Sequence, residues 1–164
     1  MTRFSLRVRW AVCLVVLAAP LFSACRTDVV PLSVRFRQEH SFLMSRSARL
    51  LVFESAPCTD LIQSVRASSF GDALFDSGSV QACDVYNGEV VFEGLPDREL
   101  AFVALSYDRD GVSLLTEGCR IANPYDSDGA VVIVQDVTDH YITEVAAQPA
   151  ECSDPQRRCD GSCP

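Results

Sequence analysis

The sequence predicts an all-β fold: an antiparallel β-sandwich of about seven or eight short strands, with one short helix and a Cys-rich C-terminal tail. Two observations predict the sandwich. Short runs of β-branched and aromatic residues are separated by turn residues at intervals of roughly 8 to 12 residues, and no long segment with helical periodicity intervenes. The tail is predicted because three cysteines fall within the last thirteen residues, where the strand pattern has stopped.

The first predicted strand covers residues 32–37, where apolar and polar side chains alternate as a half-buried strand requires. Asn87-Gly88 is the residue pair best suited to a tight hairpin turn, so the runs on either side of it are predicted to pair. Further strands are predicted over residues 49–54, 80–86, 89–93, 99–107, 112–117, 130–136 and 141–145.

One short helix is predicted over residues 59–67, where Leu61, Ile62 and Val65 fall at helical spacing. Thr59 or Asp60 is available to cap its N-terminus.

The N-terminus has the pattern of an export signal. Arg3, Arg7 and Arg9 precede an apolar run over residues 10–22 that only Pro20 interrupts. A membrane-spanning helix needs about 20 apolar residues, so this run is too short for a permanent span. Residues 1–24 are therefore predicted to be a removable signal peptide.

The sequence Leu21-Phe22-Ser23-Ala24-Cys25 resembles the lipobox of bacterial lipoproteins. The resemblance implies that Cys25 receives a diacylglyceryl group, that the signal is cut before it, and that its new amine is acylated. The alternative is an ordinary signal cut after Ala24, which would leave a soluble secreted protein. The lipobox predicts a lipid-anchored protein of the cell envelope. Because Arg26 rather than Asp follows Cys25, the resemblance favours the outer membrane.

The predicted organisation is a signal peptide over 1–24, a lipidated linker over 25–30, a β-sandwich domain over 31–147 and a Cys-rich tail over 148–164. The segments Val91-Phe92-Glu93-Gly94-Leu95-Pro96 and Ala101-Phe102-Val103-Ala104, continuing through Tyr107-Asp108-Arg109-Asp110-Gly111, resemble transthyretin-like and carboxypeptidase-regulatory-like sandwiches. Through Gly118-Cys119 the chain is similar to lipoproteins of myxobacteria. This resemblance implies a fold rather than a function.

The charge balance excludes nucleic acid as a partner. The formal net charge is −8, with 22 acidic residues, and loss of the three signal arginines would make it more negative still. Nucleic-acid binding needs a basic face, whereas acidity of this kind serves the solubility of an exported domain. Four arginines gather early in the chain and are interpreted as solvated strand faces rather than an anion site: Arg35, Arg37, Arg46 and Arg49.

Six cysteines remain beyond the signal and Cys25, and they are predicted to form disulfides: Cys58, Cys83, Cys119, Cys152, Cys159 and Cys163. Cys58 and Cys119 could tie two strand ends, with Cys83 as the rival partner for either. Cys152 and Cys159 are expected as a local bridge, which leaves Cys83 and Cys163 uncertain. Because the tail holds three cysteines, full oxidation needs a bond from the tail to the domain or to another molecule.

Two acidic turns are weak calcium candidates through Asp108, Asp110, Asp126 and Asp128. Each has a glycine and two alternate carboxylates, but lacks the further oxygen ligands of a calcium loop, so ordinary turns are favoured and no metal is predicted.

A catalytic constellation is also not found. His40 and His140 belong to no metal-spaced cluster, and no Gly-x-Ser-x-Gly elbow occurs. We therefore expect no enzyme activity and no cofactor.

The function expected from these observations is that of a membrane-anchored lipoprotein with a non-catalytic structural or protein-interaction domain. Its partners would be the membrane, through lipid on Cys25, and another envelope protein. The alternative is a ligand-binding module for calcium, carbohydrate or peptide. Carbohydrate has little support because Trp10, the sole tryptophan, is lost with the signal.

Overall fold

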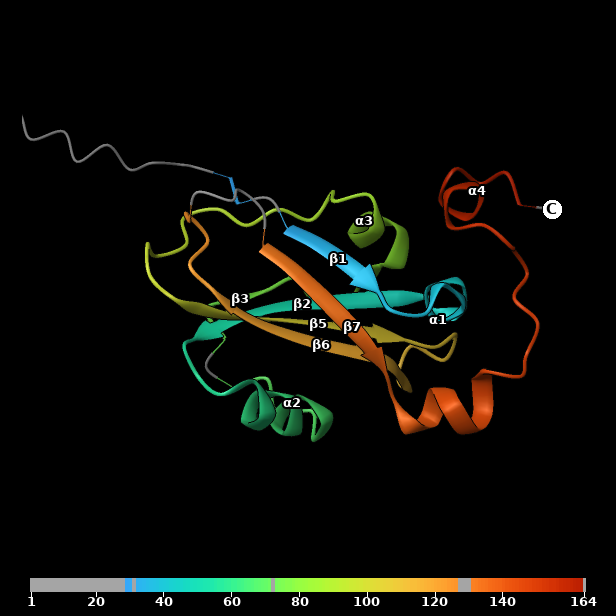
Figure 1. Ribbon diagram of the computed structural model, residues 1–164, viewed down its shortest axis with the longest axis horizontal. Coiled ribbons are helices and arrows are strands. Elements are labelled where there is room, and N and C mark those ends of the chain that lie inside the picture. The colour runs from blue at the N-terminus through green and yellow to red at the C-terminus, as the bar shows by residue number, and fades with distance from the viewer. Residues whose placement is uncertain (1–28, 31, 72, 127–130, 164) are drawn as a thin grey trace, which may run out of the picture.

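The computed structural model describes residues 29–30, 32–71, 73–126 and 131–163 (Figure 1). The predicted signal peptide, the lipidation site Cys25 and the calcium candidate Asp128 lie outside the described residues.

The described chain consists mainly of strands with a few short helices, so the predicted β-rich class is confirmed at this level. The strands are β1 (Leu32–Phe36), β2 (Ser47–Glu54), β3 (Phe75–Asp76), β4 (Val80–Gln81), β5 (Leu100–Tyr107), β6 (Leu114–Ala122) and β7 (Val131–Val137). The helices are α1 (Glu39–Met44), α2 (Cys58–Arg66), α3 (Ala82–Tyr86), the π-helical turn η1 (Tyr141–Val145) and α4 (Pro155–Cys159).

The strands of the described residues form one mixed sheet in the order β1-β7-β6-β5-β2-β3, and β4 also pairs with β2. Neighbouring strands are antiparallel except β1 and β7, which run parallel. The structure therefore differs from the expected purely antiparallel sandwich. The reason lies in β7, which crosses diagonally in front of the other strands and carries β1 on its outer edge (Figure 1). It keeps register with β6 at only two residue pairs, at its C-terminal end.

Gly118 permits this crossing. A Cβ at Gly118 would clash with the Val134 carbonyl oxygen and lie 3.0 Å from Cγ2 of Ile133. Only a residue without a side chain lets the backbone of β7 approach β6 so closely.

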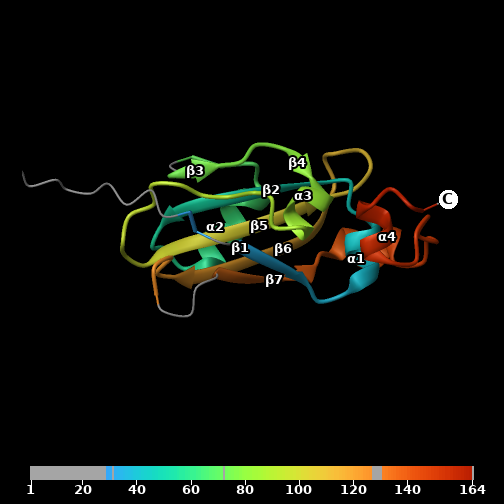
Figure 2. The same cartoon turned by 90° about the horizontal axis from the view of Figure 1, so that it is seen from above.

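Strands β2 and β5 pair along their whole length and are covered on both faces. Val52 and Phe102 belong to a core that includes residues of β1, β7 and α3. Leu51 and Val103, on the other face, belong to a core that α2 covers through Val65. The two covering layers lie on opposite sides of the sheet (Figures 1 and 2). Since both faces are buried, residues 100–105 of β5 are all apolar and inaccessible to solvent.

The predicted helix over 59–67 is confirmed as α2, but the expected cap from Thr59 or Asp60 is wrong. The helix begins at Cys58, one residue earlier, and no side chain caps it. The carbonyl of Pro57 instead accepts the first two helical bonds, from the amides of Asp60 and Leu61 at 3.1 and 3.2 Å.

The predicted hairpin around Asn87-Gly88 is wrong. Residues 82–86 form the helix α3, and the segment after it makes only an isolated bridge between Val30 and Phe92. Gly88 does take positive φ, at 71°, but it ends the helix. Its amide donates to the Val85 carbonyl and the amide of Glu89 donates to that of Asp84, which is the Schellman pattern. The same residue pair suits both motifs, so it could not distinguish them.

The predicted strand over 141–145 is also wrong, because these residues form η1. Tyr141 and Val145 are four residues apart, and the helical turn buries both against Met44 and Leu115. The Ala146 amide donates to the Tyr141 carbonyl at 2.8 Å, five residues back, as in a π-helix. Burial of two side chains on one face outweighs the β propensity of this segment.

A chain of buried hydroxyl and amide groups crosses the end of the sheet next to α1. Ser45 and Ser106 share a 2.8 Å hydrogen bond, Ser106 and Thr116 share one of 2.5 Å, and Thr116 donates to the side-chain oxygen of Gln135 at 2.8 Å. The chain joins the C-terminus of α1 to β5, β6 and β7, and it satisfies groups that would be costly to bury unpaired.

Candidate functional site

Several charged side chains of the described residues lie close together at one end of the molecule. There α1, the turn between β5 and β6, the η1 segment and the Cys-rich tail come together (Figures 1 and 2).

The described residues contain three disulfides, of which two involve the tail. Cys58 is bonded to Cys119, which is the pairing that the strand ends suggested. Cys83 is bonded to Cys159 and Cys152 to Cys163, with Cα–Cα distances of 5.3 and 5.6 Å.

The expected local bridge between Cys152 and Cys159 is therefore wrong. Helix α4 directs Cys159 toward α3, and the chain turns back at Gly161, where φ is 69°, to bring Cys163 to Cys152. The Cys83–Cys159 bond ties the tail to the domain.

Arg158 docks the tail on α1. Its guanidinium donates to the carbonyls of Phe42 and Ser45 at the C-terminal end of that helix, and its Cζ lies 4.9 Å from the centre of the Phe42 ring. Burial lowers the pKa of Arg158, the positive charge of Arg109 lowers it further, and the negative charge of Glu151 opposes both. Both acceptors are neutral. Among the described residues, no carboxylate lies within ion-pair distance of this side chain.

A cavity of about 480 Å³ lies between the domain and the docked tail. Its lining residues are Leu43, Met44, Arg46, Arg109, Glu151, Cys152, Arg158, Gly161 and Cys163. The Arg109 guanidinium lies 2.9 Å from a carboxylate oxygen of Glu151, whose side chain is 78% exposed. Arg46 donates to the Arg109 carbonyl at 3.4 Å. The cavity thus combines three guanidinium groups with a single carboxylate and an apolar patch.

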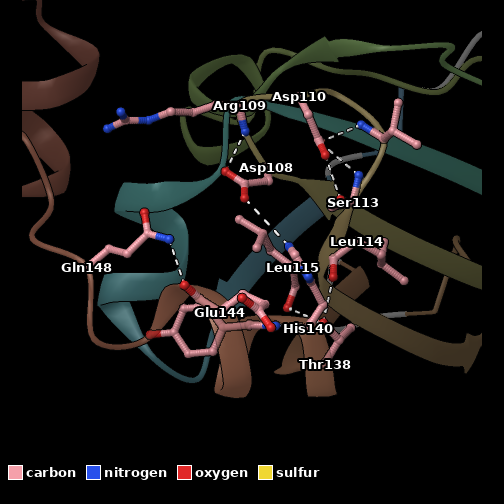
Figure 3. Close-up of polar contacts among 12 residues, drawn as sticks. Asp108, Arg109, Asp110, Ser113, Leu114, Leu115, Thr138, His140, Glu144 and Gln148 are labelled. Carbon is pink, nitrogen blue, oxygen red and sulfur yellow. Dashed lines mark hydrogen bonds and ion pairs between the residues drawn. The ribbon is translucent and has the colours of Figure 1, made fainter.

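The turn that carries Arg109 is built on Asp110 (Figure 3). One of its carboxylate oxygens accepts the amides of Val112 and Ser113, each at 2.8 Å, and the other accepts the Ser113 hydroxyl at 2.6 Å. These bonds, the hydroxyl first, lower the pKa of Asp110 to about 2. Asp110 therefore holds the turn closed with both of its oxygens engaged.

The calcium candidates do not converge. Asp108 and Asp110 lie in the turn before β6, whereas Asp126 is exposed beyond the far end of that strand. Asn123 is close to Asp126 in the sequence and could add an oxygen ligand beside it. Its amide group instead donates to Asp97, and its side-chain oxygen accepts a hydrogen bond from the Tyr125 amide. In the part of the chain that the structure describes, no group of three or more His, Cys, Asp or Glu side chains is placed to hold a metal ion.

His140 faces Asp108 across the same turn, with 3.6 Å between Nε2 and Oδ2 (Figure 3). This Nε2 is buried and has no hydrogen-bond partner among the described residues. The Ser113 hydroxyl, which the turn brings to the same region, donates to Asp110 rather than to the imidazole. The described groups thus do not form the nucleophile–base contact that acyl transfer requires.

His40 has a structural role. Its Nε2 lies 2.9 Å from the Gln148 carbonyl and its Nδ1 lies 2.8 Å from the Tyr141 hydroxyl. A carbonyl only accepts, so Nε2 carries the proton that it donates, and in the neutral ring Nδ1 accepts from the tyrosine. His40 thereby fastens the start of the tail to α1.

The early arginine cluster separates in the structure. Arg37 pairs with Asp136 and Arg49 with Asp76, which lowers the pKa of Asp76. Arg46 instead meets Arg109 and Arg158, which come from distant segments. Sequence spacing carried no sign of this convergence, although the odd number of cysteines in the tail required a bond to the domain or to another molecule.

Comparisons with protein families, curated proteins and solved structures find no match for this chain. None of the helices in the described residues is long and apolar enough to cross a membrane.

Proposed function

We propose that this chain is a lipoprotein of the bacterial cell envelope, anchored by lipid on Cys25 and acting through a non-catalytic protein-interaction domain. The observation that carries the proposal is the lipobox-like segment ending at Cys25, placed directly after a basic segment and a short apolar run. Two or more acyl chains would hold such a protein durably on its membrane.

The disulfides support an exported location. All six cysteines beyond Cys25 are paired in three bonds, and such bonds persist in oxidising compartments rather than in the cytosol. The outer membrane is the proposed destination because Arg26 follows Cys25.

The proposed relation of the domain to transthyretin-like sandwiches has support in its packing. The β1–β7 pair and the β2–β5 pair share one buried core, which is the arrangement of two layers around a common interior. A non-catalytic role is favoured because the one buried imidazole nitrogen without a partner in the described residues, on His140, faces a carboxylate and no nucleophile.

Labelling with a radioactive or clickable fatty acid in a bacterial host tests the anchor. We expect the wild-type chain to carry label and to sediment with membranes, and Cys25→Ser to lose the label. Cys13→Ser is the matched control, because Cys13 lies within the predicted signal and should leave labelling unchanged. An unlabelled wild-type chain, cut after Ala24 and recovered in the soluble fraction, would refute the proposal in favour of simple secretion.

A further inference from the structure

The cavity between the domain and the tail holds an excess of positive charge in a strongly acidic chain. Arg46, Arg109 and Arg158 line it, and Glu151 is the only acidic residue among its lining residues. The chain as a whole carries a formal net charge of −8. The local balance is therefore opposite to that of the molecule, and it arises only because the tail is docked.

Arg158 has no carboxylate of the described residues within ion-pair distance, and only the more distant charge of Glu151 acts on it. This side chain is half-buried, and its two terminal nitrogens donate to backbone carbonyls. Partial burial of a cation that has no direct ion-pair partner is costly, and an anion bound in the adjoining cavity would relieve part of that cost. Arg158 itself positions the tail, while the exposed side chains of Arg46 and Arg109 remain able to contact a ligand.

Glu151 shows what kind of group fits. Its carboxylate lies 2.9 Å from the Arg109 guanidinium, yet its side chain is largely in solvent. An exposed pair of this kind contributes little energy, so another carboxylate can displace it. Leu43 and Met44 provide an apolar wall beside the same guanidinium groups. The cavity volume of about 480 Å³ has room for a short pair of side chains from a peptide.

We propose that this cavity binds an acidic peptide segment, in which a glutamate or aspartate beside an apolar residue takes the place of Glu151 on Arg109 and also contacts Arg46. The assignment of a protein as the source of the peptide rests on the proposed function. Strand β1 runs toward the end where α1 and α4 lie (Figure 1), so the chain enters β1 from the opposite end. The cavity thus lies at the end of the domain opposite the point where the described chain enters β1.

Fluorescence anisotropy with the full chain, in a nonionic detergent and with its disulfides intact, tests the proposal. The probe is a fluorescein-labelled peptide of alternating leucine and glutamate, and the comparison peptide has glutamine in place of glutamate. We expect about tenfold tighter binding of the glutamate peptide, because one charge-assisted hydrogen bond contributes on that scale, and we expect added salt to weaken it.

The variants separate a site from general attraction. Arg46→Gln and Arg109→Gln should each weaken binding by about tenfold, again the scale of one charge-assisted bond. Glu151→Gln should strengthen binding because it removes the competing carboxylate. Arg98→Gln is the matched control, since Arg98 is an exposed arginine paired with Glu54 at the other end of β5 and should bind like wild type.

Several outcomes would overturn the inference: equal affinity for the two peptides, no effect of Arg46→Gln and Arg109→Gln, or weaker binding by Glu151→Gln. If inorganic phosphate competes as strongly as the unlabelled peptide, the site binds simple anions and the assignment of an acidic peptide is wrong. Cys25→Ser should bind like wild type, so that failure of the peptide site and failure of the lipid anchor are distinguishable.

Discussion

The paired strands β2 and β5 and the tail over 148–163 are held in place by different forces. In the strand pair, residues 100–105 of β5 are inaccessible to solvent and both faces are covered by apolar side chains. In the tail, Cys152 is the only buried residue among those that the structure describes. The tail is fixed by the Cys83–Cys159 bond, by Arg158 on α1 and by His40 on the Gln148 carbonyl.

This difference separates a region stabilised by apolar packing from a segment ordered by disulfides and polar contacts. Burial of apolar side chains stabilises the strand pair. Its contribution to the free energy of folding depends on the apolar area buried and on close packing, not on specific polar partners. Covalent and polar links can order a segment that has too little apolar surface to fold alone. They also leave charged groups at the junction, and the cationic cavity lies there.

The largest expected effect is in the strand pair. Phe102→Ala removes a fully buried ring between two layers and should lower the free energy of unfolding by about 3 to 5 kcal/mol. Urea denaturation measures this loss. Val112→Ala is the control, because that side chain is 78% exposed and its removal should change stability by less than about 0.5 kcal/mol. Similar losses of unfolding free energy in both variants would contradict the burial of Phe102 in the core.

The second prediction compares two disulfides of long span. Replacing Cys58 and Cys119 together by Ala removes a link of sequence separation 61 and should cost about 4 kcal/mol in the chain-entropy estimate. Replacing Cys83 and Cys159 together should lower the free energy of unfolding of the domain by less. Without this bond the tail can detach from the domain and gain conformational entropy while the domain stays folded.

Urea denaturation and limited trypsin digestion at Arg157 and Arg158 measure the two effects. We expect faster cleavage there only in the Cys83 and Cys159 variant, where the tail is released. If both double variants lose stability equally and resist cleavage equally, the tail and the domain form one cooperative unit.

The crossing of β7 over β6 gives the third prediction. Gly118→Ala places a methyl group against the Val134 carbonyl and should lower stability by about 1 to 3 kcal/mol, as overpacking does. Gly71→Ala serves as the control, because a methyl group at Gly71 would meet no atom of the described residues within 4 Å. The melting temperatures of the two variants are compared with that of the wild type. An unchanged melting temperature of Gly118→Ala would contradict the close approach of β7 to β6.

The smallest effect concerns the turn at the edge of the cavity. The pKa of Asp110 lies at about 2, below its ordinary value of 3.8. A depressed carboxyl pKa stabilises the folded state fully above the ordinary value, and this stabilisation is lost as the pH falls toward 2. Ser113→Ala removes the leading cause and should raise the pKa of Asp110. Carboxyl titration by NMR measures the shift; an unchanged pKa would mean that the backbone amides alone set it.

The sequence by itself determined the features that depend on local pattern. Alternation and apolar runs located β1, β2, β5 and β7, and helical spacing of Leu61, Ile62 and Val65 located α2. The parity of the cysteines required a bond that leaves the tail. These inferences succeeded because periodicity reports directly which side chains are buried.

The tertiary structure alone decided the parallel pairing of β1 with β7, the helical form of residues 82–86 and 141–145, and the Cys152–Cys163 bond. It also brought Arg46, Arg109 and Arg158 to one cavity. These features depend on contacts between segments far apart in the chain, and even the Cys152–Cys163 bond depends on Cys83, which pairs with Cys159. Local propensity is too weak to determine such features, because its differences are of the order of 1 kcal/mol or less per residue, whereas tertiary packing acts on many side chains at once.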